Sequence, residues 1–285
     1  MSARFNLKEV RSYYDRHTPE FVTRGQGGPL GAIHRAVWGP GIHNREDAFR
    51  YVEHQIGDRL GTLTETNTLS QPHVIDLGCG VGSSLCTLAE RLNIRGTGIT
   101  LSPVQARAAQ QHISRLGLSD RIRCIEGDYC NLPKDCDVAD LAYAIESFVH
   151  TPDPTGFFRQ CASQVRTGGL LVVCDDFRAA NDSATGQRVV EKFCRGWHIN
   201  SLMNPIDFRN LAASQGFEHL ETVDLTPHLE IGRPRDRLIA LGIYLFGWIP
   251  TVADRFDYLL GGNALQVCLS KGWVRYELAV FQRVG

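Results

Sequence analysis

Val74-Ile75-Asp76-Leu77-Gly78-Cys79-Gly80-Val81-Gly82 is the stretch that decides the fold of this chain. A short apolar run with one acidic residue is followed by three alternating glycines, and the residues after Gly82 are typical of a helix. Glycine adopts backbone angles that other residues avoid, and without a Cβ atom it lets a ligand approach the main chain. The first turn of the helix presents free N–H groups to the same space. The stretch therefore predicts a strand, a tight turn and a helix that together bind a nucleotide.

From this stretch onward, short apolar runs alternate with helical patterns. The predicted strands cover residues 74–77, 96–100, 122–126, 138–144, 170–174 and 219–225, followed by two strand-like runs at 265–269 and 273–281. The predicted helices cover residues 82–92, 103–116, 154–165 and 205–215. Gly168-Gly169 is expected to separate the third helix from the strand after it. This alternation predicts an α/β fold built on a doubly wound, mainly parallel seven-stranded sheet.

The residues before the sheet, 1–66, are predicted to form a helical N-terminal cap. The cap contains a glycine-rich turn at 25–29 and a helical, aromatic pattern at 33–38, and a second helix is predicted through Ala48, Tyr51, Val52 and Ile56. Residues 62–72 are a predicted polar linker. The unit at 67–285 interrupts its alternation at about 177–203 and 226–262, where we expect insertions that cover the substrate side.

Composition excludes a chain-wide electrostatic attraction to nucleic acid. The 285 residues suffice for one α/β domain with appendages, and 30 Lys+Arg against 31 Asp+Glu give a formal net charge of -1. No global field draws such a chain to nucleic acid or to an anionic membrane, so any recognition of an anion must be local.

Cysteine spacing and hydropathy indicate a cytoplasmic protein. The 9 cysteines lack the spacing of a zinc site, and no secretory signal opens the chain, so we expect reduced, buried thiols. The longest apolar run, 238–250, is shorter than the roughly 20 residues that span a bilayer. It predicts a buried or lipid-touching helix, with no integral membrane segment, and the oligomeric state stays open, a homo-oligomer included.

Two classes of ligand use such a glycine turn, namely dinucleotides and S-adenosylmethionine. The dinucleotide fingerprint is Gly-x-Gly-x-x-Gly with an acidic residue about 20 residues further on, which binds a ribose hydroxyl. Here the third glycine, Gly82, comes one residue early, and the second strand ends in Thr100 rather than in an acid. Both departures count against NAD.

Three motifs in order carry a resemblance to a known family. As Asp-x-Gly-x-Gly-x-Gly, residues 76–82 resemble the first motif of class I S-adenosylmethionine-dependent methyltransferases. Residues 98–105, Gly-Ile-Thr-Leu-Ser-Pro-Val-Gln, resemble the second motif of the branch that contains tocopherol, cyclopropane/mycolic-acid and prenyl-diphosphate methyltransferases. Glu126-Gly127-Asp128-Tyr129 resembles the third motif. The resemblance spans about residues 72–176 and implies the Rossmann-like fold of that family.

The resemblance also implies how S-adenosyl-L-methionine is held. Thr100 and Gln105 match the residues that hold the ribose, Asp128 the one that accepts from the adenine amino group, and Tyr14 a cap tyrosine near the cofactor carboxylate. The ligand's chemistry agrees, because its ammonium suits Asp76 and its carboxylate suits the N–H groups of the glycine turn. The predicted cofactor-binding residues are Tyr14, Asp76, Gly78, Cys79, Gly80, Gly82, Thr100, Leu101, Gln105, Asp128, Tyr129 and Ala144. For Asp76 and Asp128 the alternative is a carboxylate that only caps a turn at the end of a strand.

Residues 143–150 follow the fourth strand and are expected beside the transferred methyl group. Glu146 is a candidate to take a proton from carbon after methylation of an alkene, or to stabilise a carbocation, because a carboxylate among apolar neighbours is costly without a purpose. His150 is a candidate general base for a hydroxyl or amine acceptor. The alternatives are a salt bridge or helix cap for Glu146 and a hydrogen-bonded core histidine for His150.

Two further groups are candidates for binding the acceptor. Trp38, Tyr51 and Trp197 offer aromatic walls, with ordinary core packing as the alternative. Arg233 and Arg235 lie in an arginine cluster beside the apolar run and suit phosphate oxygens, with a solvated basic turn as the alternative. Together they match an acceptor with a diphosphate head and a hydrocarbon tail, which would bring Mg²⁺ with it.

The sequence therefore favours an enzyme of secondary metabolism that methylates a small, largely apolar metabolite. Carbon methylation of a prenyl (diphosphate) acceptor, an isoprenoid, is the sharper hypothesis and rests on Glu146, the cap aromatics and the arginine cluster. An O- or N-methyltransferase of natural-product biosynthesis, with His150 as base, is the alternative. A third hypothesis is a protein that binds the cofactor without catalysis. A nucleic-acid substrate is disfavoured because no basic, aromatic-interleaved stripe is present.

Overall fold

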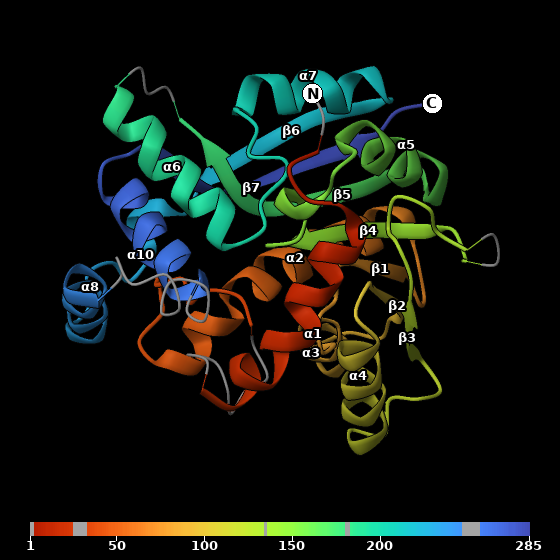
Figure 1. Cartoon of the computed structure of the whole chain (residues 1–285). Helices are drawn as coiled ribbons and strands as arrows, with labels where there is room; N and C mark the ends of the chain where they lie inside the picture. The colour runs from red at the N-terminus through yellow and green to blue at the C-terminus, as the bar shows by residue number, and fades with distance from the viewer. Residues whose placement is uncertain (1–2, 25–32, 134–135, 180–182, 247–256) are drawn as a thin grey trace.

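The computed structural model describes residues 3–24, 33–133, 136–179, 183–246 and 257–285. The predicted glycine-rich turn at 25–29 lies outside these residues, as does the end of the apolar run 238–250. A twisted sheet crosses the middle of the molecule, with α5 (Pro154–Gln164) and α7 (Pro205–Ser214) on one side and α3 (Ser83–Arg91) and α4 (Pro103–Arg115) on the other (Figure 1). Two buried clusters of apolar side chains, one on each face, make up most of the core.

The sheet has seven strands in the order β3-β2-β1-β4-β5-β7-β6, which confirms the predicted fold class. The strands are β1 (His73–Leu77), β2 (Arg95–Thr100), β3 (Ile122–Glu126), β4 (Ala139–Ile145), β5 (Val165–Arg178), β6 (Phe217–Asp224) and β7 (Val274–Arg283). The first five run parallel, and β7 is antiparallel to both β5 and β6. The strand order reverses between β1 and β4, and open α/β sheets bind ligands beyond the carboxyl ends of the strands at such a point.

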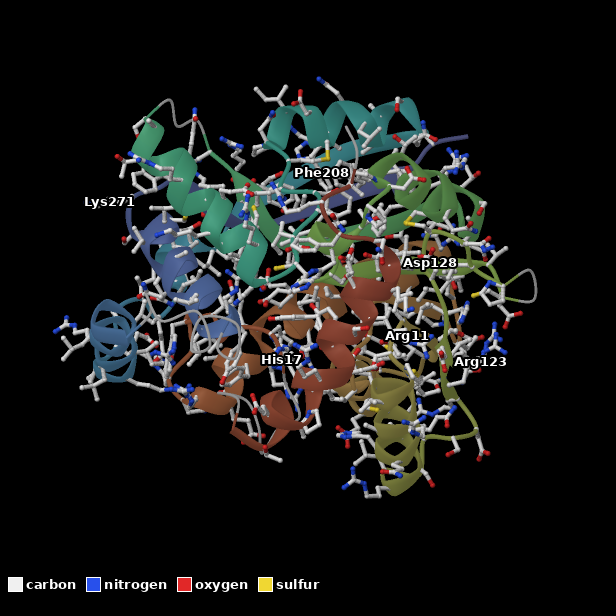
Figure 2. The ribbon with its side chains drawn as sticks, in the orientation of Figure 1. Arg11, His17, Arg123, Asp128, Phe208 and Lys271 are labelled. Atoms are coloured by element: carbon white, nitrogen blue, oxygen red, sulfur yellow. The ribbon has the colours of Figure 1, made fainter. Side chains whose placement is uncertain are left out.

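The helices begin where the sequence supplies capping groups. The side chain of Ser102 accepts from the N–H of Gln105 at the start of α4, and Asp153 does the same for Gly156 in α5. Proline occupies the first turn of both helices, where its missing N–H costs nothing. Phe208 of α7 points into the core and packs against the aromatic rings beneath it (Figure 2).

The predicted strand at 265–269 is wrong, because these residues lie within helix α10 (Asp257–Ser270). A short apolar run fits a buried helix as well as a strand. Here Leu265, Cys268 and Leu269 recur at helical spacing and pack against Phe193 and Cys194 of α6 (Ala184–Gly196). Gly272 then turns the chain into β7 with φ +66°.

Three boundaries also differ from the predictions. Residues 33–38 are not helical but form an irregular segment with a bend at His34, and Val37 bridges Leu229. Helix α2 (Arg45–Asn67), which follows α1 (Leu7–Arg24), runs into the predicted linker. The glycine pair 168–169 lies inside β5 at an irregular register against β4, where Gly168 has φ +75°. At Val37 and at residues 168–169, pairing with a segment that is distant in the sequence overrides the local helix pattern and the local breaker pattern.

The helices beyond the carboxyl ends of the strands pack on one another. Helix α10 contacts both α6 and α8 (Pro234–Phe246), and α8 lies at the edge of the molecule away from the sheet (Figure 1). Within the described part of the chain, no helix combines the length and the hydropathy that crossing a membrane requires. All nine cysteines are free thiols; eight are buried and Cys130 is half-buried.

Candidate active site

A cavity of about 440 Å³ opens at the carboxyl ends of β1, β2, β4 and β5, under α1 and α10. Residues from the cap, from the strand ends and from both insertions line it. The cavity brings together these sequence-predicted residues: Tyr14, Asp76, Gly78, Cys79, Gly80, Thr100, Leu101, Gln105, Tyr129, Glu146, His150, Trp197 and Arg235.

The glycine turn has the backbone that its sequence predicts. Gly78 has φ +94° and Gly80 has φ +53°, which are left-handed values that favour glycine. The N–H groups of Gly78 and Cys79 both donate to the carbonyl of Ile99, at 2.9 Å and 2.8 Å, and this fastens the turn to β2. A Cβ at Gly78 would collide with Ser147, whereas one at Gly80 would meet only Ile33, at 3.5 Å. The first glycine is needed for packing, and the second leaves the backbone open to the cavity.

Asp76 is a buried carboxylate at the end of β1 that faces the cavity. Its side chain is 3% exposed, and Oδ2 accepts from the Tyr143 hydroxyl at 2.8 Å. Burial raises the pKa of Asp76 to about 7, which the hydrogen bond from Tyr143 only partly offsets. A cation placed in the cavity beside this carboxylate would restore its ionised form.

Thr100 and Gln105 meet at the end of β2, beside helix α1. The Thr100 hydroxyl donates to Gln105 Oε1 at 2.7 Å, and Gln105 Nε2 donates to the Thr18 hydroxyl at 3.1 Å. Ser102 donates to Asp15 of the same helix. Helix α1 is therefore hydrogen-bonded to the second motif. The polar side chains of Thr100 and Gln105 are suited to bind hydroxyl groups at this edge of the sheet.

Three of the predicted cofactor residues do not line the cavity. Gly82 is the N-cap of α3, with Ala109 close behind it, and Ala144 is buried within β4. Asp128 follows β3, and its Oδ1 accepts from the N–H of Cys130 at 2.8 Å. In this structure the Asp128 carboxylate caps a turn.

Three of the predicted acceptor residues also lie outside the cavity wall. Trp38 packs against the small cluster of Ala36, Ala48 and Phe49. The ring of Tyr51 covers Gly39, where a Cβ would collide with it. Arg233 forms ion pairs with Glu230 at 3.2 Å and with Asp236 at 3.0 Å. Its charge is thereby matched by two carboxylates within its own turn.

Glu146 lies in a carboxylate–arginine–carboxylate bridge. Its Oε1 accepts from the backbone N–H of Arg35 at 2.9 Å, from Arg35 Nε at 3.0 Å and from the Tyr276 hydroxyl at 2.9 Å. Arg35 donates with both terminal nitrogens to Asp176, each at 2.9 Å, and its guanidinium lies 4.1 Å from the centre of the Tyr276 ring. Burial raises the pKa of Glu146, but the charge of Arg35 outweighs it and the pKa falls below its usual value.

Most of this bridge could not be predicted from the sequence. Arg35 is separated from Glu146 by 111 residues and from Asp176 by 141, and no local pattern links them. A signal existed for Asp175 and Asp176, since these two adjacent acids directly follow the apolar run 170–174 within β5. Both line the cavity, and burial raises the pKa of Asp175 well above its usual value.

His34, which the sequence did not indicate as a site residue, forms a buried pair with Glu53. Its Nε2 lies 2.9 Å from Glu53 Oε1, and Ser84 donates to the same oxygen at 3.0 Å. Burial lowers the pKa of His34, but the Glu53 carboxylate outweighs it and raises the pKa to about 9. His34 therefore adds a positive charge to the cavity wall beside Ser84, at the start of α3.

His150 is held as a neutral imidazole. Its Nδ1 lies 3.1 Å from the carbonyl of His198, which can only accept, so Nδ1 carries the proton. Nε2 then accepts from the Tyr14 hydroxyl at 2.6 Å. Burial lowers the pKa of His150 to about 4 and raises that of Tyr14. The pair forms a chain of hydrogen bonds from the cavity wall to the backbone of residue 198.

Comparison with known proteins identifies the family. A family model described as a methyltransferase domain matches residues 74–169. Methyltransferase GfsG of Streptomyces halstedii is 31% identical over 208 residues, which cover 72% of this chain and 69% of that protein. The chain is a class I S-adenosylmethionine-dependent methyltransferase. The hypothesis of a binding protein without catalysis is thereby set aside.

This methyltransferase is also similar to another relative and to a solved structure. (+)-O-methylkolavelool synthase of Herpetosiphon aurantiacus is 24% identical over 230 residues, covering 79% of this chain and 76% of that protein. The solved structure of geranyl diphosphate C-methyltransferase from Streptomyces coelicolor, with Mg²⁺, geranyl diphosphate and S-adenosyl-L-homocysteine, shares the fold with a TM-score of 0.67. It is 18% identical and covers 98% of both chains.

The residues at the glycine turn of this methyltransferase fit S-adenosylmethionine. Asp76 would hold the ammonium, the N–H groups at the turn and the start of α3 would hold the carboxylate, and Thr100 with Gln105 would hold the ribose. Among the described residues, no group of three His, Cys, Asp or Glu side chains is placed to hold a metal ion.

Binding of the cofactor product is expected to release a proton below neutral pH. Asp76 has a pKa of about 7 in the free protein, and an ammonium beside it favours the ionised form, so affinity falls as the pH drops through 7. Between pH 7 and pH 5.5, affinity for S-adenosylhomocysteine should fall about tenfold to thirtyfold. Calorimetry in buffers of different ionisation enthalpy measures the number of protons that binding releases. Asp76→Asn should bind weakly with no such slope, and an equal slope in this variant would contradict the assignment.

Proposed function

We propose that this methyltransferase transfers the methyl group to a hydroxyl oxygen of a small, largely apolar metabolite. The observation that carries the proposal is the chain from Tyr14 through His150 to the backbone carbonyl of His198, in the wall of the cavity. It offers a neutral nitrogen to a proton arriving from the cavity. Hydroxyl groups are poor nucleophiles until such a group takes their proton.

The side chains of this chain would handle the proton as follows. Bound S-adenosylmethionine supplies an electrophilic methyl group on a sulfonium. As the acceptor oxygen takes up the methyl group, its proton passes to the Tyr14 oxygen, and the Tyr14 proton passes to His150 Nε2. The imidazole becomes an imidazolium, which the nearby carboxylate of Glu146 favours. His150 would then return the proton to water when the products leave.

The charges of the cavity wall favour an acceptor without a diphosphate. Glu146, Asp175 and Asp176 lie on the acceptor side, where Arg35 is already bound to two of them. Arg233 is matched by Glu230 and Asp236, which leaves Arg235 as the arginine of the predicted cluster that lines the cavity. Carbon methylation of a prenyl diphosphate with Mg²⁺ stays a prediction, and these contacts support it less than they support a hydroxyl acceptor. The name of the O-methylkolavelool synthase agrees with oxygen as the methylated atom.

A substrate panel tests the proposal. The enzyme is incubated with labelled S-adenosylmethionine and one of four acceptor classes: terpenoid or polyketide alcohols, phenols, amines, and prenyl diphosphates with Mg²⁺. Labelled ethers from the hydroxyl compounds are the expected products. Product from prenyl diphosphates, or from amines, in the absence of any labelled ether would overturn it.

Glu146→Gln separates the two acceptor chemistries. Glutamine keeps an oxygen for Arg35 and Tyr276, and Arg35 keeps its two bonds to Asp176, so transfer to a hydroxyl should slow by less than about tenfold. Carbon methylation requires a carboxylate base, and turnover should then collapse while cofactor binding is retained. Steady-state kcat and calorimetry with S-adenosylhomocysteine measure both quantities, and a collapse in kcat would favour carbon methylation.

A further inference from the structure

Helix α8 presents two large apolar side chains to solvent. Leu238 is 71% exposed and Leu241 is 54% exposed, and Ile231, just before the helix, is 36% exposed. The run 238–250 is predicted to form a buried or a lipid-touching helix, and the exposure of these two leucines counts against the buried alternative. Helix α8 packs on α10 and lies at the edge of the molecule, where its outer side meets no other labelled element (Figure 1).

The charged residues of α8 are arranged around these leucines. At 100° per residue, the exposed side chains follow one another around the helix in the order Arg237, Leu241, Leu238, Arg235, across an arc of roughly 160°. An arginine therefore borders the leucine pair on each side, and both arginines are exposed. Asp236, the acidic residue of α8, lies on the opposite side, where Arg233 binds it.

The inner side of the same helix closes the active-site cavity. Asp236 and Ile239 line it, together with Arg235 at the border of the exposed arc. Across from them, Leu259 and Leu265 of α10 line the same space. Helix α8 therefore lies between the cavity, which its inner side lines, and the surface on which its two leucines are exposed.

We propose that α8 docks on the surface of an anionic lipid bilayer. Helices with a central apolar strip bordered by basic residues lie in the bilayer interface, where the apolar side chains enter the acyl region and the basic ones meet the headgroups. The formal net charge of -1 provides no attraction by the whole molecule, so the arginines of α8 provide it locally. The wall of the cavity that α8 forms then lies next to the bilayer, the phase in which an apolar acceptor is most soluble.

Vesicle flotation with the full chain tests the proposal. Vesicles of phosphatidylcholine mixed with phosphatidylglycerol should bind the protein, with less binding at high salt, and vesicles of phosphatidylcholine alone should bind it weakly. The double variant Leu238→Ser/Leu241→Ser should lose at least about tenfold in binding, and Arg237→Glu about fivefold. No acceptor is present, so the outcome is independent of the proposed hydroxyl substrate.

A matched control replaces exposed apolar residues elsewhere. Ile206 in α7 is 62% exposed and Leu220 in β6 is 49% exposed, and both elements lie away from α8 (Figure 1). Ile206→Ser/Leu220→Ser should bind vesicles like the wild type. Thermal unfolding and S-adenosylhomocysteine binding should be the same in all variants. Equal vesicle binding by the leucine variant overturns the proposal, as does an absence of binding. Sedimentation tests whether a second copy of the chain covers this face instead of a bilayer. A wild-type dimer that the leucine substitutions dissociate would show this and would overturn the proposal.

Discussion

Replacing His150 with glutamine is expected to lower kcat for the hydroxyl acceptor by about 10²- to 10⁴-fold. The imidazole is the neutral group at the end of the Tyr14 hydrogen bond, and glutamine accepts that bond without being able to take the proton. S-adenosylhomocysteine should bind with unchanged affinity, because His150 is not among the residues predicted to bind the cofactor and glutamine keeps the hydrogen bond to Tyr14. Tyr14→Phe should also lower kcat, since it removes the hydroxyl through which the proton passes.

The pH profile distinguishes this role from a structural one. At saturating cofactor, kcat of the wild type should be level between pH 6 and 8 and should fall only toward pH 4, because burial lowers the pKa of His150 to about 4 and the base must be neutral. His112, half-buried in α4, is a control, since His112→Gln should leave kcat unchanged. If kcat of His150→Gln is within a few fold of the wild-type value, His150 does not act as the general base.

The second large effect concerns stability, and it follows from replacing Arg35 with methionine. The substitution leaves Glu146 and Asp176 buried without their shared cation, and breaking a buried ion pair in this way costs about 3–5 kcal/mol. The Arg35 side chain is 17% exposed, and Asp176 is 2% exposed, so solvent screens the bridge little. Denaturant unfolding at neutral pH should show the loss.

The loss from Arg35→Met should shrink in acid. Arg35 lowers the pKa of Glu146, so its contribution to stability is present above the pKa of the unfolded state and disappears as the pH falls through the folded pKa. Arg159→Met is the matched control. Arg159 is 69% exposed and lies 4.0 Å from Asp153, and such a surface pair contributes about 0–1 kcal/mol. If both variants unfold alike, the bridge does not stabilise the fold.

The sequence largely predicted which of the proposed cofactor-binding residues lie together in the cavity. Asp76, Gly78 and Gly80 are neighbours in the chain, and Thr100 and Gln105 lie within one strand–helix turn. Parallel strands bring their carboxyl ends to the same edge of the sheet, so local patterns at successive strand ends meet in space. Asp128 was predicted on the same grounds. It lies at this edge of the sheet, where its carboxylate caps a turn.

The strand prediction at 265–269 failed because an apolar run carries no period when it is short. Leu265 and Leu269 are buried by α6, and that contact, formed across about 75 residues of chain, selects the helix. The helix prediction at 33–38 was wrong for a related reason, since the bridge of Val37 to Leu229 joins segments that are far apart in the sequence.

The sequence by itself determined the sheet, the glycine turn and the methyl donor, because each depends on residues that are close along the chain. Only the tertiary structure decided what surrounds the acceptor. Tyr14 and His150 are 136 residues apart, and Glu146 and Tyr276 are 130 apart. Their hydrogen bonds depend on how the cap and the last strand pack over the sheet. Burial in that packing then sets which groups are neutral and which are charged.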